Sequence, residues 1–286
     1  MKYSFLKENC SRFSVKKMAD MLDISRSGYY SWLTRPESRR SRDNQIIKER
    51  IEEIFEDNRK VYGSPRITNS LREEGLRIGC NRVARIMKIN GISAKINKKF
   101  RVQTTDSNHD FPISPNRLKQ KFQASRPNRI WVSDITYIKI GIKWAYLCII
   151  EDLFNNEIVG WSFASHMRTE MVIAAFRSAV NKRNPDSGLI FHSDRGSQYA
   201  SHDFRQELEN HDFKSSMSRK GNCYDNAPAE SFFHTLKNEE VRRKKYKSFK
   251  EAKRNLFDYI EVFYNRRRKH SSLGYLSPVQ YLEMSA

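Results

Sequence analysis

Three acidic residues stand where a fold could bring their carboxylates together. Asp134 lies within an apolar run, Asp194 ends the run LIFHSD, and Glu230 ends NAPAE at the start of a helical pattern, with 59 and 35 residues in the two gaps. Carboxylate oxygens are ligands that Mg²⁺ prefers, and the ion is typically held by one or two carboxylates plus substrate phosphates. Two such ions about 3.5–4 Å apart can activate a water or a 3′-hydroxyl for in-line phosphoryl displacement. The three acids therefore predict metal-assisted phosphoryl chemistry.

Each acid, taken alone, also has an ordinary structural explanation. Asp194 could be a turn residue, Glu230 a partner of the helix dipole, and Asp134 a salt-bridged strand residue. Asp134 is the most informative of the three, because Trp131 and Val132 make its strand too apolar to accept an unpaired charge cheaply. A bound metal would supply the missing positive charge. The three acids jointly favour a single site over three unrelated structural roles.

The elements around these acids are expected to alternate between strands and helices. IWVSDITYIKI, KWAYLCIIEDL and EIVGWSFA read as three successive strands, the last following a turn at Asn155-Asn156, and predict an antiparallel meander. We then expect a helix at 169–182, a buried strand at 188–194, a helix at 201–211, a short strand at 213–218, and mostly helices afterwards. This order is that of a ribonuclease-H-like α/β fold, in which Asn226 caps the helix of Glu230 and Pro228 suits its first turn.

Two helical modules are predicted ahead of this core. Residues 14–33 read as a helix-turn-helix with Ser25 as the N-cap of the second helix, although an ordinary helical hairpin has the same pattern. A second module follows an Arg/Ser-rich joint at 36–42 and ends in a helix at 81–90. This helix has basic residues at spacings of three opposite an apolar face, as a groove-reading helix requires. These basic residues are Arg82, Arg85 and Lys88.

Positive charge is concentrated just ahead of the α/β region. The 286 residues carry a formal net charge of +20, of which residues 76–130 hold +11 and residues 131–286 only +5. Such a density costs self-repulsion unless a polyanion lies against it, and release of counterions from nucleic acid is the usual compensation. A well-solvated surface is the alternative. Besides the basic residues of the helix at 81–90, the candidate contacts to nucleic acid include Lys98, Lys99 and Arg101.

Composition excludes several other classes of protein. With 38% hydrophobic residues the chain can form a packed core, so it is not a disordered basic tail. Its longest apolar run, residues 144–150, is far shorter than the roughly 20 residues of a membrane span, and the first residues lack a secretory apolar stretch. We therefore expect a soluble protein in the cytoplasm or on the nucleoid. The four cysteines are far apart and form no CxxC pair, which disfavours a zinc site or disulfide framework.

Several sequence blocks resemble a known family. They are YGSPRI in the second helical module, WVSDITYI, HSDRGSQY and NAPAESFFHTLKNE around the three acids, and YNRRRKHSSLGYLSPVQYLE near the C-terminus. In this order they resemble the integrase-like DDE transposases of bacterial insertion sequences, specifically the OrfB-type catalytic subunit, over essentially the whole chain. The resemblance implies a ribonuclease-H-like (integrase core) catalytic domain of the α/β class, preceded by all-α helix-turn-helix modules.

The resemblance also implies roles for single residues. Asp134, Asp194 and Glu230 would be the catalytic and metal-binding triad, with Mg²⁺ or Mn²⁺, two ions per site, in cleavage of element ends and strand transfer. The basic residue that the family has seven positions beyond the Glu is here Lys237, about two helical turns further, where it could meet a DNA phosphate. Retroviral integrases add an N-terminal His/His/Cys/Cys zinc module, but the first histidine here is His109, which disfavours that branch.

Other positions have less specific signals. Gln198 and His192 flank Asp194 and could orient DNA or a metal ligand, but a buried strand histidine and a helix-start glutamine explain them equally well. Arg266 and Arg267 begin a basic run to residue 269 and are candidates for DNA binding, although such a run also suits the end of a helix. His270 is expected to be structural or to face a phosphate.

The predicted organisation leaves some questions of function open. We expect a helix-turn-helix module at 1–40, a second helical DNA-binding module at 41–96, a basic linker at 97–127, the catalytic core at 128–240 and a helical extension at 241–286. The partners would be double-stranded DNA of the element's terminal repeats and of the target, a second copy on DNA, and an upstream-frame DNA-binding protein fused by frameshift. A non-catalytic helix-turn-helix regulator and a structure-specific nuclease remain alternatives.

Overall fold

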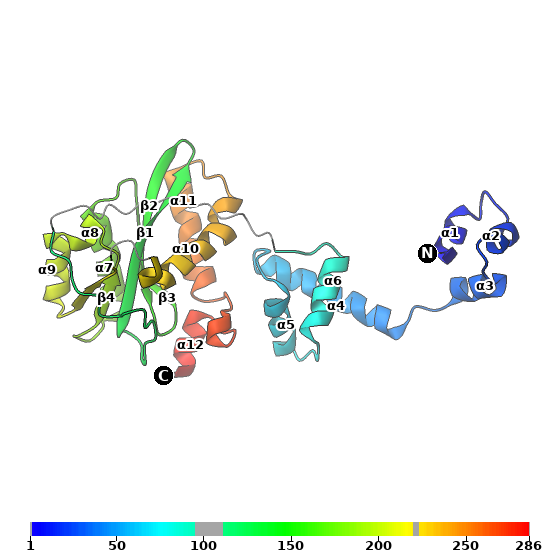
Figure 1. Cartoon of the computed structure of the whole chain (residues 1–286), viewed down its shortest axis with the longest axis horizontal. Coiled ribbons are helices and arrows are strands. Elements are labelled where there is room, and N and C mark those ends of the chain that lie inside the picture. The colour runs from blue at the N-terminus through cyan, green and yellow to red at the C-terminus, as the bar shows by residue number, and fades with distance from the viewer. Residues whose placement is uncertain (1, 95–110, 220–222, 286) are drawn as a thin grey trace.

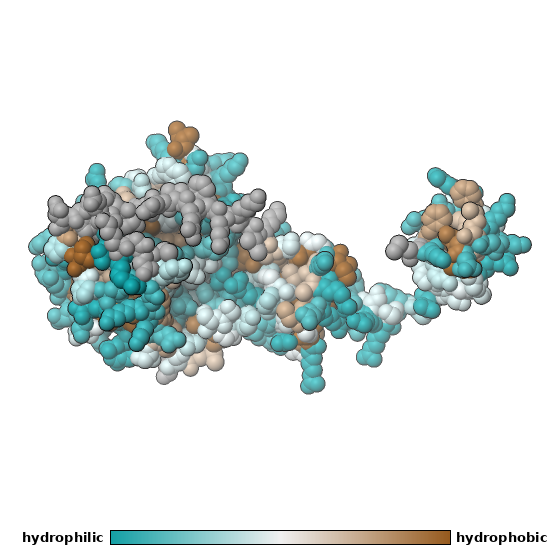
Figure 2. Space-filling model, in the orientation of Figure 1, coloured by the Kyte–Doolittle hydropathy of each residue, from teal (hydrophilic) through white to brown (hydrophobic). Residues whose placement is uncertain are grey.

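The computed structural model describes residues 2–94, 111–219 and 223–285. Figure 1 shows an α/β core, the second helical module (residues 39–89) beside it, and the N-terminal helical module (residues 2–34). In the described residues, no helix is long and apolar enough to cross a membrane. The surface in Figure 2 is mainly hydrophilic, with scattered apolar spots.

The N-terminal module consists of three short helices, α1 (Lys2–Asn9), α2 (Val15–Met21) and α3 (Arg26–Thr34). The predicted turn between the second and third is present, with Asp23 at φ 48° and the Ser25 side chain accepting a hydrogen bond from the Gly28 amide. Helix α1 was not expected, because only one of its side chains is buried and no apolar repeat marks it. The module has a small apolar cluster of its own, formed by Leu6, Met18, Ala19 and Tyr29.

The second module contains α4 (Arg39–Asp57), α5 (Ser64–Glu73) and α6 (Cys80–Ile89). The expected joint at 36–42 is wrong in its second half, because α4 begins at Arg39. The Ser38 side chain accepts a hydrogen bond from the Ser41 amide at 3.2 Å and caps the helix there. Helix α6 is the predicted amphipathic helix, and Gly91 ends it with φ at 67°. Its buried side chains are those of Val83, Ile86 and Met87.

A five-stranded sheet forms the core, with the strand order β3-β2-β1-β4-β5. The first three strands pair antiparallel as predicted, β4 pairs with β1 in parallel, and β5 pairs with β4 in parallel. Asn156 has φ at 56° in the turn between β2 and β3, a conformation that asparagine tolerates. The strands are β1 (Ile130–Ile140), β2 (Lys143–Asp152), β3 (Glu157–Ala164), β4 (Ile190–Ser193) and β5 (Lys214–Met217). This mixed order is the ribonuclease-H-like arrangement that the sequence predicted.

Helices cover both faces of the sheet. One face is covered by α7 (Thr169–Arg183), α8 (Ser197–Ala200) and α9 (His202–Asn210), which bury an apolar cluster around Trp131 and Phe176. The other face is covered by α10 (Ala227–Glu239), α11 (Phe249–Phe257) and the π-helix η3 (Asp258–Tyr264). Short 3₁₀ turns η1 (Cys223–Asn226), η2 (Val241–Arg243) and η4 (Ser271–Leu273), and helix α12 (Pro278–Ser285), complete the C-terminal part.

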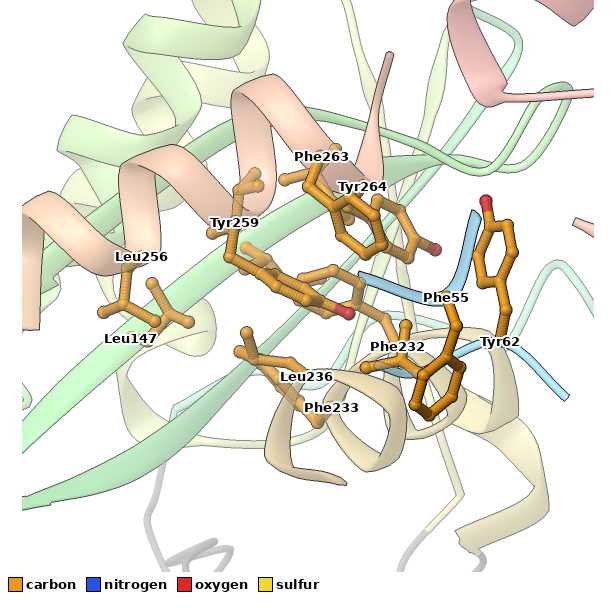
Figure 3. Packing of buried hydrophobic residues seen from close by; sticks show 14 of the residues in the cluster. Phe55, Tyr62, Leu147, Phe232, Phe233, Leu236, Leu256, Tyr259, Phe263 and Tyr264 are labelled. Carbon is orange, nitrogen blue, oxygen red and sulfur yellow. The ribbon is translucent and has the colours of Figure 1, made fainter. Parts of the chain in front are cut away.

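The second helical module shares its apolar core with the sheet. Figure 3 shows Phe55 and Tyr62 of this module close to Phe232 of α10 and Tyr264 of η3, in one buried cluster. Polar contacts reinforce the junction. The Tyr62 hydroxyl accepts a hydrogen bond from the Lys269 amide at 2.9 Å. Arg59 Nη1 lies 3.0 Å from the buried Glu240 carboxylate, Arg59 also pairs with Asp258, and Lys269 pairs with Glu73. The module is therefore fixed against the helices that carry part of the candidate site.

Candidate active site

Strand β1 carries Asp134 where one of its edges is open. Strand β4 pairs only with residues 130–132 of β1, whereas β2 continues beside the strand and pairs Ile149 with Asp134. The Asp134 side chain is half-buried, and its Oδ1 accepts a hydrogen bond from the Ile135 amide at 2.8 Å. The open edge leaves room for groups that follow β4 and that begin α10.

Asp194 directly follows β4, so it stands at the carboxyl end of the strand that runs parallel to β1. Its Oδ1 accepts a hydrogen bond from the Gly196 amide at 2.9 Å. A Cβ atom on Gly196 would lie 3.1 Å from this oxygen and 2.9 Å from Oε1 of Gln198, so the turn has no room for a larger residue without displacing them. Gln198 in turn donates from Nε2 to the Met167 carbonyl at 3.0 Å, which anchors the turn to the segment ahead of α7.

Glu230 lies in the first turn of α10 and is exposed. The expectation that Asn226 caps this helix is half wrong. Asn226 occupies the N-cap position, but its side chain makes no capping hydrogen bond, and its Nδ2 lies 3.4 Å from the Ser133 carbonyl of β1 instead. Pro228 stands in the first turn as predicted. The start of α10 is thus tied to the residue that precedes Asp134.

The three acids are near enough for their charges to interact. Burial raises the pKa of Asp134 well above its usual range, the negative charge of Asp194 raises it further, and that of Glu230 adds to this effect. Acids that repel one another in this way favour a bound cation. Within the described residues, no three His, Cys, Asp or Glu side chains form a ready-made metal cluster. Water and substrate phosphate commonly complete a Mg²⁺ shell of few protein ligands.

A buried network holds the segment that leads into α10. The carboxylate of Asp225 is bonded at 2.9 Å by Arg219, by Gln120 and by Asn116, and Arg219 holds the pKa of Asp225 well below its usual range. His192 of β4 lies with Nε2 2.8 Å from the Asp225 carbonyl and Nδ1 2.8 Å from Ser216 Oγ. His192 therefore has the structural role that the sequence left open.

Asp225 itself was missed by the sequence reasoning. Its partners lie 6 and more than 100 residues away, so no local spacing marks it. The one local signal is its place in CYDN, directly before the helix of Glu230.

Lys237 points back toward the acids along α10. Its Nζ lies 4.6 Å from the centre of the Tyr137 ring. Burial lowers the pKa of Lys237, the positive charge of Arg242 lowers it further, and the negative charge of Asp134 opposes both. The sequence placed this lysine near the acids, and the structure adds the aromatic ring on which it rests.

The other predicted DNA contacts lie in different surroundings. Arg85 and Lys88 are exposed on α6, whereas Arg82 is half-buried and donates from Nη2 to Asn44 Oδ1 at 2.8 Å. Arg266 and Arg267 are exposed after η3. These positions remain predictions. Lys98, Lys99 and Arg101 lie outside the described residues.

The basic run that continues from Arg267 faces inward. Arg268 is buried and forms two hydrogen bonds with the Glu239 carboxylate, of 2.8 and 2.7 Å. His270 is also buried, with the edge of its ring packed against Tyr264. The structural interpretation of His270 is supported, because the residue is buried, packs against Tyr264 and lies with Nε2 3.4 Å from Nη1 of Arg268.

Comparisons with known proteins place the chain among insertion-sequence proteins. Integrase core domain models match residues 124–223 and 230–285, and an HTH-like domain model matches residues 41–100. An uncharacterized 31 kDa protein of insertion element IS600 from Shigella sonnei is 42% identical over 266 residues, which cover 93% of this chain and 97% of that protein. Transposase InsF for insertion sequence IS3A from Escherichia coli (strain K12) is 38% identical over 98% of each chain.

Among solved structures, the HTLV-2 integrase catalytic core domain in complex with magnesium is 18% identical, with a TM-score of 0.42. That match covers 55% of this chain and 97% of the other. The likeness in sequence to the InsF and IS600 proteins extends over nearly the whole chain, through both the HTH-like and the integrase core regions. The protein therefore belongs to the family of IS3-type insertion-sequence transposases.

Proposed function

We propose that Asp134, Asp194 and Glu230 are the catalytic carboxylates of this transposase, and that they hold Mg²⁺ or Mn²⁺, two ions per site. The observation that supports the proposal is that Asp194 and Glu230 interact electrostatically with Asp134, although the three come from the open stretch of β1, the end of β4 and the first turn of α10. The donor set consists of oxygens, which suits these hard cations. When bound, the ions would supply an activated water or 3′-hydroxyl and stabilise the leaving oxygen.

The residues of the chain have separate tasks in this proposal. Asp134 and Asp194 are held by backbone amides, so their carboxylates are oriented before substrate arrives. Glu230 is exposed, so its side chain is accessible to the DNA backbone. Lys237 would meet a phosphate beside the acids. No side chain has to form a covalent bond to DNA, because a water and then the freed DNA 3′-hydroxyl serve as nucleophiles in cleavage and joining.

The test uses the Glu230→Gln variant. The matched control is Glu209→Gln, which changes an exposed acid of α9. We expect Glu230→Gln to bind an end-containing duplex but to lose both cleavage and joining, and to lose heat of Mn²⁺ binding in calorimetry. The control should keep all of these. Undiminished strand transfer by Glu230→Gln would overturn the assignment. A protein that cut ends but never joined them to a target would be a nuclease of the same fold.

We further propose that the helical modules and the basic segment hold the terminal repeats of the element, and that two copies act together on two ends. Support comes from the HTH-like match and from the exposed Arg85 and Lys88 on α6. Replacing both with alanine should weaken binding to all sequences and reduce the salt slope by about 2. An unchanged slope would remove α6 from the interface.

A frameshift fusion with an upstream-frame DNA-binding protein is proposed as an additional working form of the transposase. Mass spectrometry of the transposase purified from cells that carry the whole element tests it. A longer species with upstream-frame peptides supports the fusion, and the 33.9 kDa product alone contradicts it.

A further inference from the structure

The hairpin of β1 and β2 exposes a tryptophan close to the candidate active site. Trp144 is 48% exposed at the start of β2, directly opposite Lys139 of β1 in the strand register. Ile142, in the turn between the strands, is 93% exposed. Exposed apolar side chains beside lysines form a surface that suits a ligand with both apolar faces and negative charge.

A continuous series of contacts joins this tryptophan to the acids. Asp134 and Lys237 interact electrostatically, and Lys237 lies over the ring of Tyr137 at 4.6 Å. The Tyr137 ring meets Trp144 edge to face, with 5.0 Å between ring centres and 79° between the planes. Lys139 Nζ lies 6.0 Å from the centre of the Trp144 ring. The order from the candidate catalytic carboxylate to the exposed end of the hairpin is therefore Lys237, Tyr137, Trp144 and Lys139, which places two aromatic rings in contact with a cation at each end.

Two rings flanked by cations suit the chemistry of a single nucleic-acid strand. Its phosphates attract ammonium groups, and its bases stack on aromatic rings when they are not covered by neighbouring bases. Within a duplex both faces of an internal base are covered, so a tryptophan can stack only on a base that has left the helix or on the open face of a terminal base pair. The alternative is that Trp144 is exposed only to solvent. That alternative gives no reason for the contacts that link Trp144 through Tyr137 to Lys237.

We propose that Trp144 stacks on an unpaired base of the DNA end, one that lies near the scissile phosphate, while Lys139 and Lys237 contact the flanking phosphates. The inference rests on the carboxylate site proposed above, because that site defines where the scissile phosphate lies. Trp144 acts as a positioning residue: it holds the strand so that the phosphodiester reaches Asp134 and its partners.

The experiment measures the affinity for DNA ends in a Glu230→Gln background, so that chemistry does not enter the readout. The variants are Trp144→Ala, Trp144→Phe and, as the matched control, Phe257→Ala, which removes a 53% exposed aromatic side chain of α11. The DNA series carries one abasic nucleotide at each position near the cleavage point. Thermal melting of each variant checks that the hairpin change leaves the fold intact.

Trp144→Ala should bind the intact end about 5- to 150-fold more weakly, as for loss of one stacked base, with partial recovery in Trp144→Phe and no change in Phe257→Ala. At one abasic position the difference in affinity between the Trp144→Ala variant and its parent should disappear, because the stacked base is already absent. The proposal is overturned if Trp144→Ala binds the intact end within twofold of its parent, or if its deficit is the same at every abasic position.

Failure of this proposal is distinguishable from failure of the catalytic assignment. Coupling between Trp144 and one base would support stacking even if Glu230→Gln retained strand transfer. Conversely, loss of chemistry in Glu230→Gln without such coupling would leave the carboxylate assignment standing and remove Trp144 from the DNA interface.

Discussion

His270 is expected to make folding strongly dependent on pH below neutrality. Its ring is 7% exposed, with Nε2 3.4 Å from Nη1 of Arg268, and it lines a pocket of about 250 Å³ together with Arg66 and Glu151. Burial lowers the pKa of His270 to about 2 in the folded protein, with the charges of Arg268 and then Arg66 acting in the same direction. In the unfolded chain the same group has a pKa of about 6.5.

The sign follows from proton binding in the two states. Between pH 6.5 and 2 the unfolded chain binds a proton that folded His270 does not, so the free energy of unfolding falls as the pH falls. The loss starts near the unfolded pKa and reaches about 2 kcal/mol at pH 5 relative to pH 8. Glu151, whose pKa is raised to about 8 by burial and by Asp152, acts with the opposite sign, so the effect must be measured as a difference between proteins.

The assay compares urea unfolding of wild type, His270→Gln and His202→Gln at pH 8, 6.5 and 5. Glutamine can still accept a hydrogen bond from Arg268 but cannot gain a proton. The advantage of wild type over His270→Gln should therefore shrink by about 2 kcal/mol between pH 8 and pH 5. His202 is exposed, so its variant should follow wild type at each pH. Parallel curves for wild type and His270→Gln would refute the reasoning.

Two other predictions concern the scaffold of the site. Gly160→Ala on β3 should lower the free energy of unfolding in urea by about 1–3 kcal/mol. The added Cβ would lie 2.4 Å from the Ala175 carbonyl oxygen and 2.7 Å from Ala179 Cβ. An unchanged midpoint of urea unfolding would contradict the close packing of α7 on β3. Asp225→Asn should cost about 1.5–3 kcal/mol at pH 7 by breaking the charged bonds to Arg219. Because the folded pKa of Asp225 is depressed, this cost should shrink progressively as the pH drops below about 4, and a cost at pH 2 as large as that at pH 7 would contradict its electrostatic origin.

Much of the fold could be predicted because local sequence patterns indicate it. The alternation in β1, the apolar run of β2 and the turn at Asn156 are local signals, and the meander they predict is present. Helix α1 and the start of α4 were not predictable in the same way. Helix α1 lacks an apolar repeat. Helix α4 begins in a basic segment, and the hydrogen bond from the Ser41 amide to the Ser38 side chain marks where the helix starts.

The contacts around the candidate site depended on groups that are distant in the chain. Asn226 is a good capping residue by type, but the carbonyl of Ser133, 93 residues away, takes its side chain. Arg268 reads as one of four exposed basic residues, yet Glu239 and the packing of the second module draw it inside. The type of a residue limits the hydrogen bonds and ion pairs that it can form. The residues that surround it in the folded protein determine which of these interactions it makes.

By itself the sequence indicated the class of the protein, three candidate acids and a polyanionic partner, because motifs, spacing and charge density need no folded context. Only the tertiary structure decided that α4 to α6 share one core with the sheet, that Asp225 and His192 hold the approach to α10, and that Lys237 rests on Tyr137 beside Trp144. These are contacts between residues far apart in the chain. Their existence depends on how the sheet and helices pack, which no local pattern specifies.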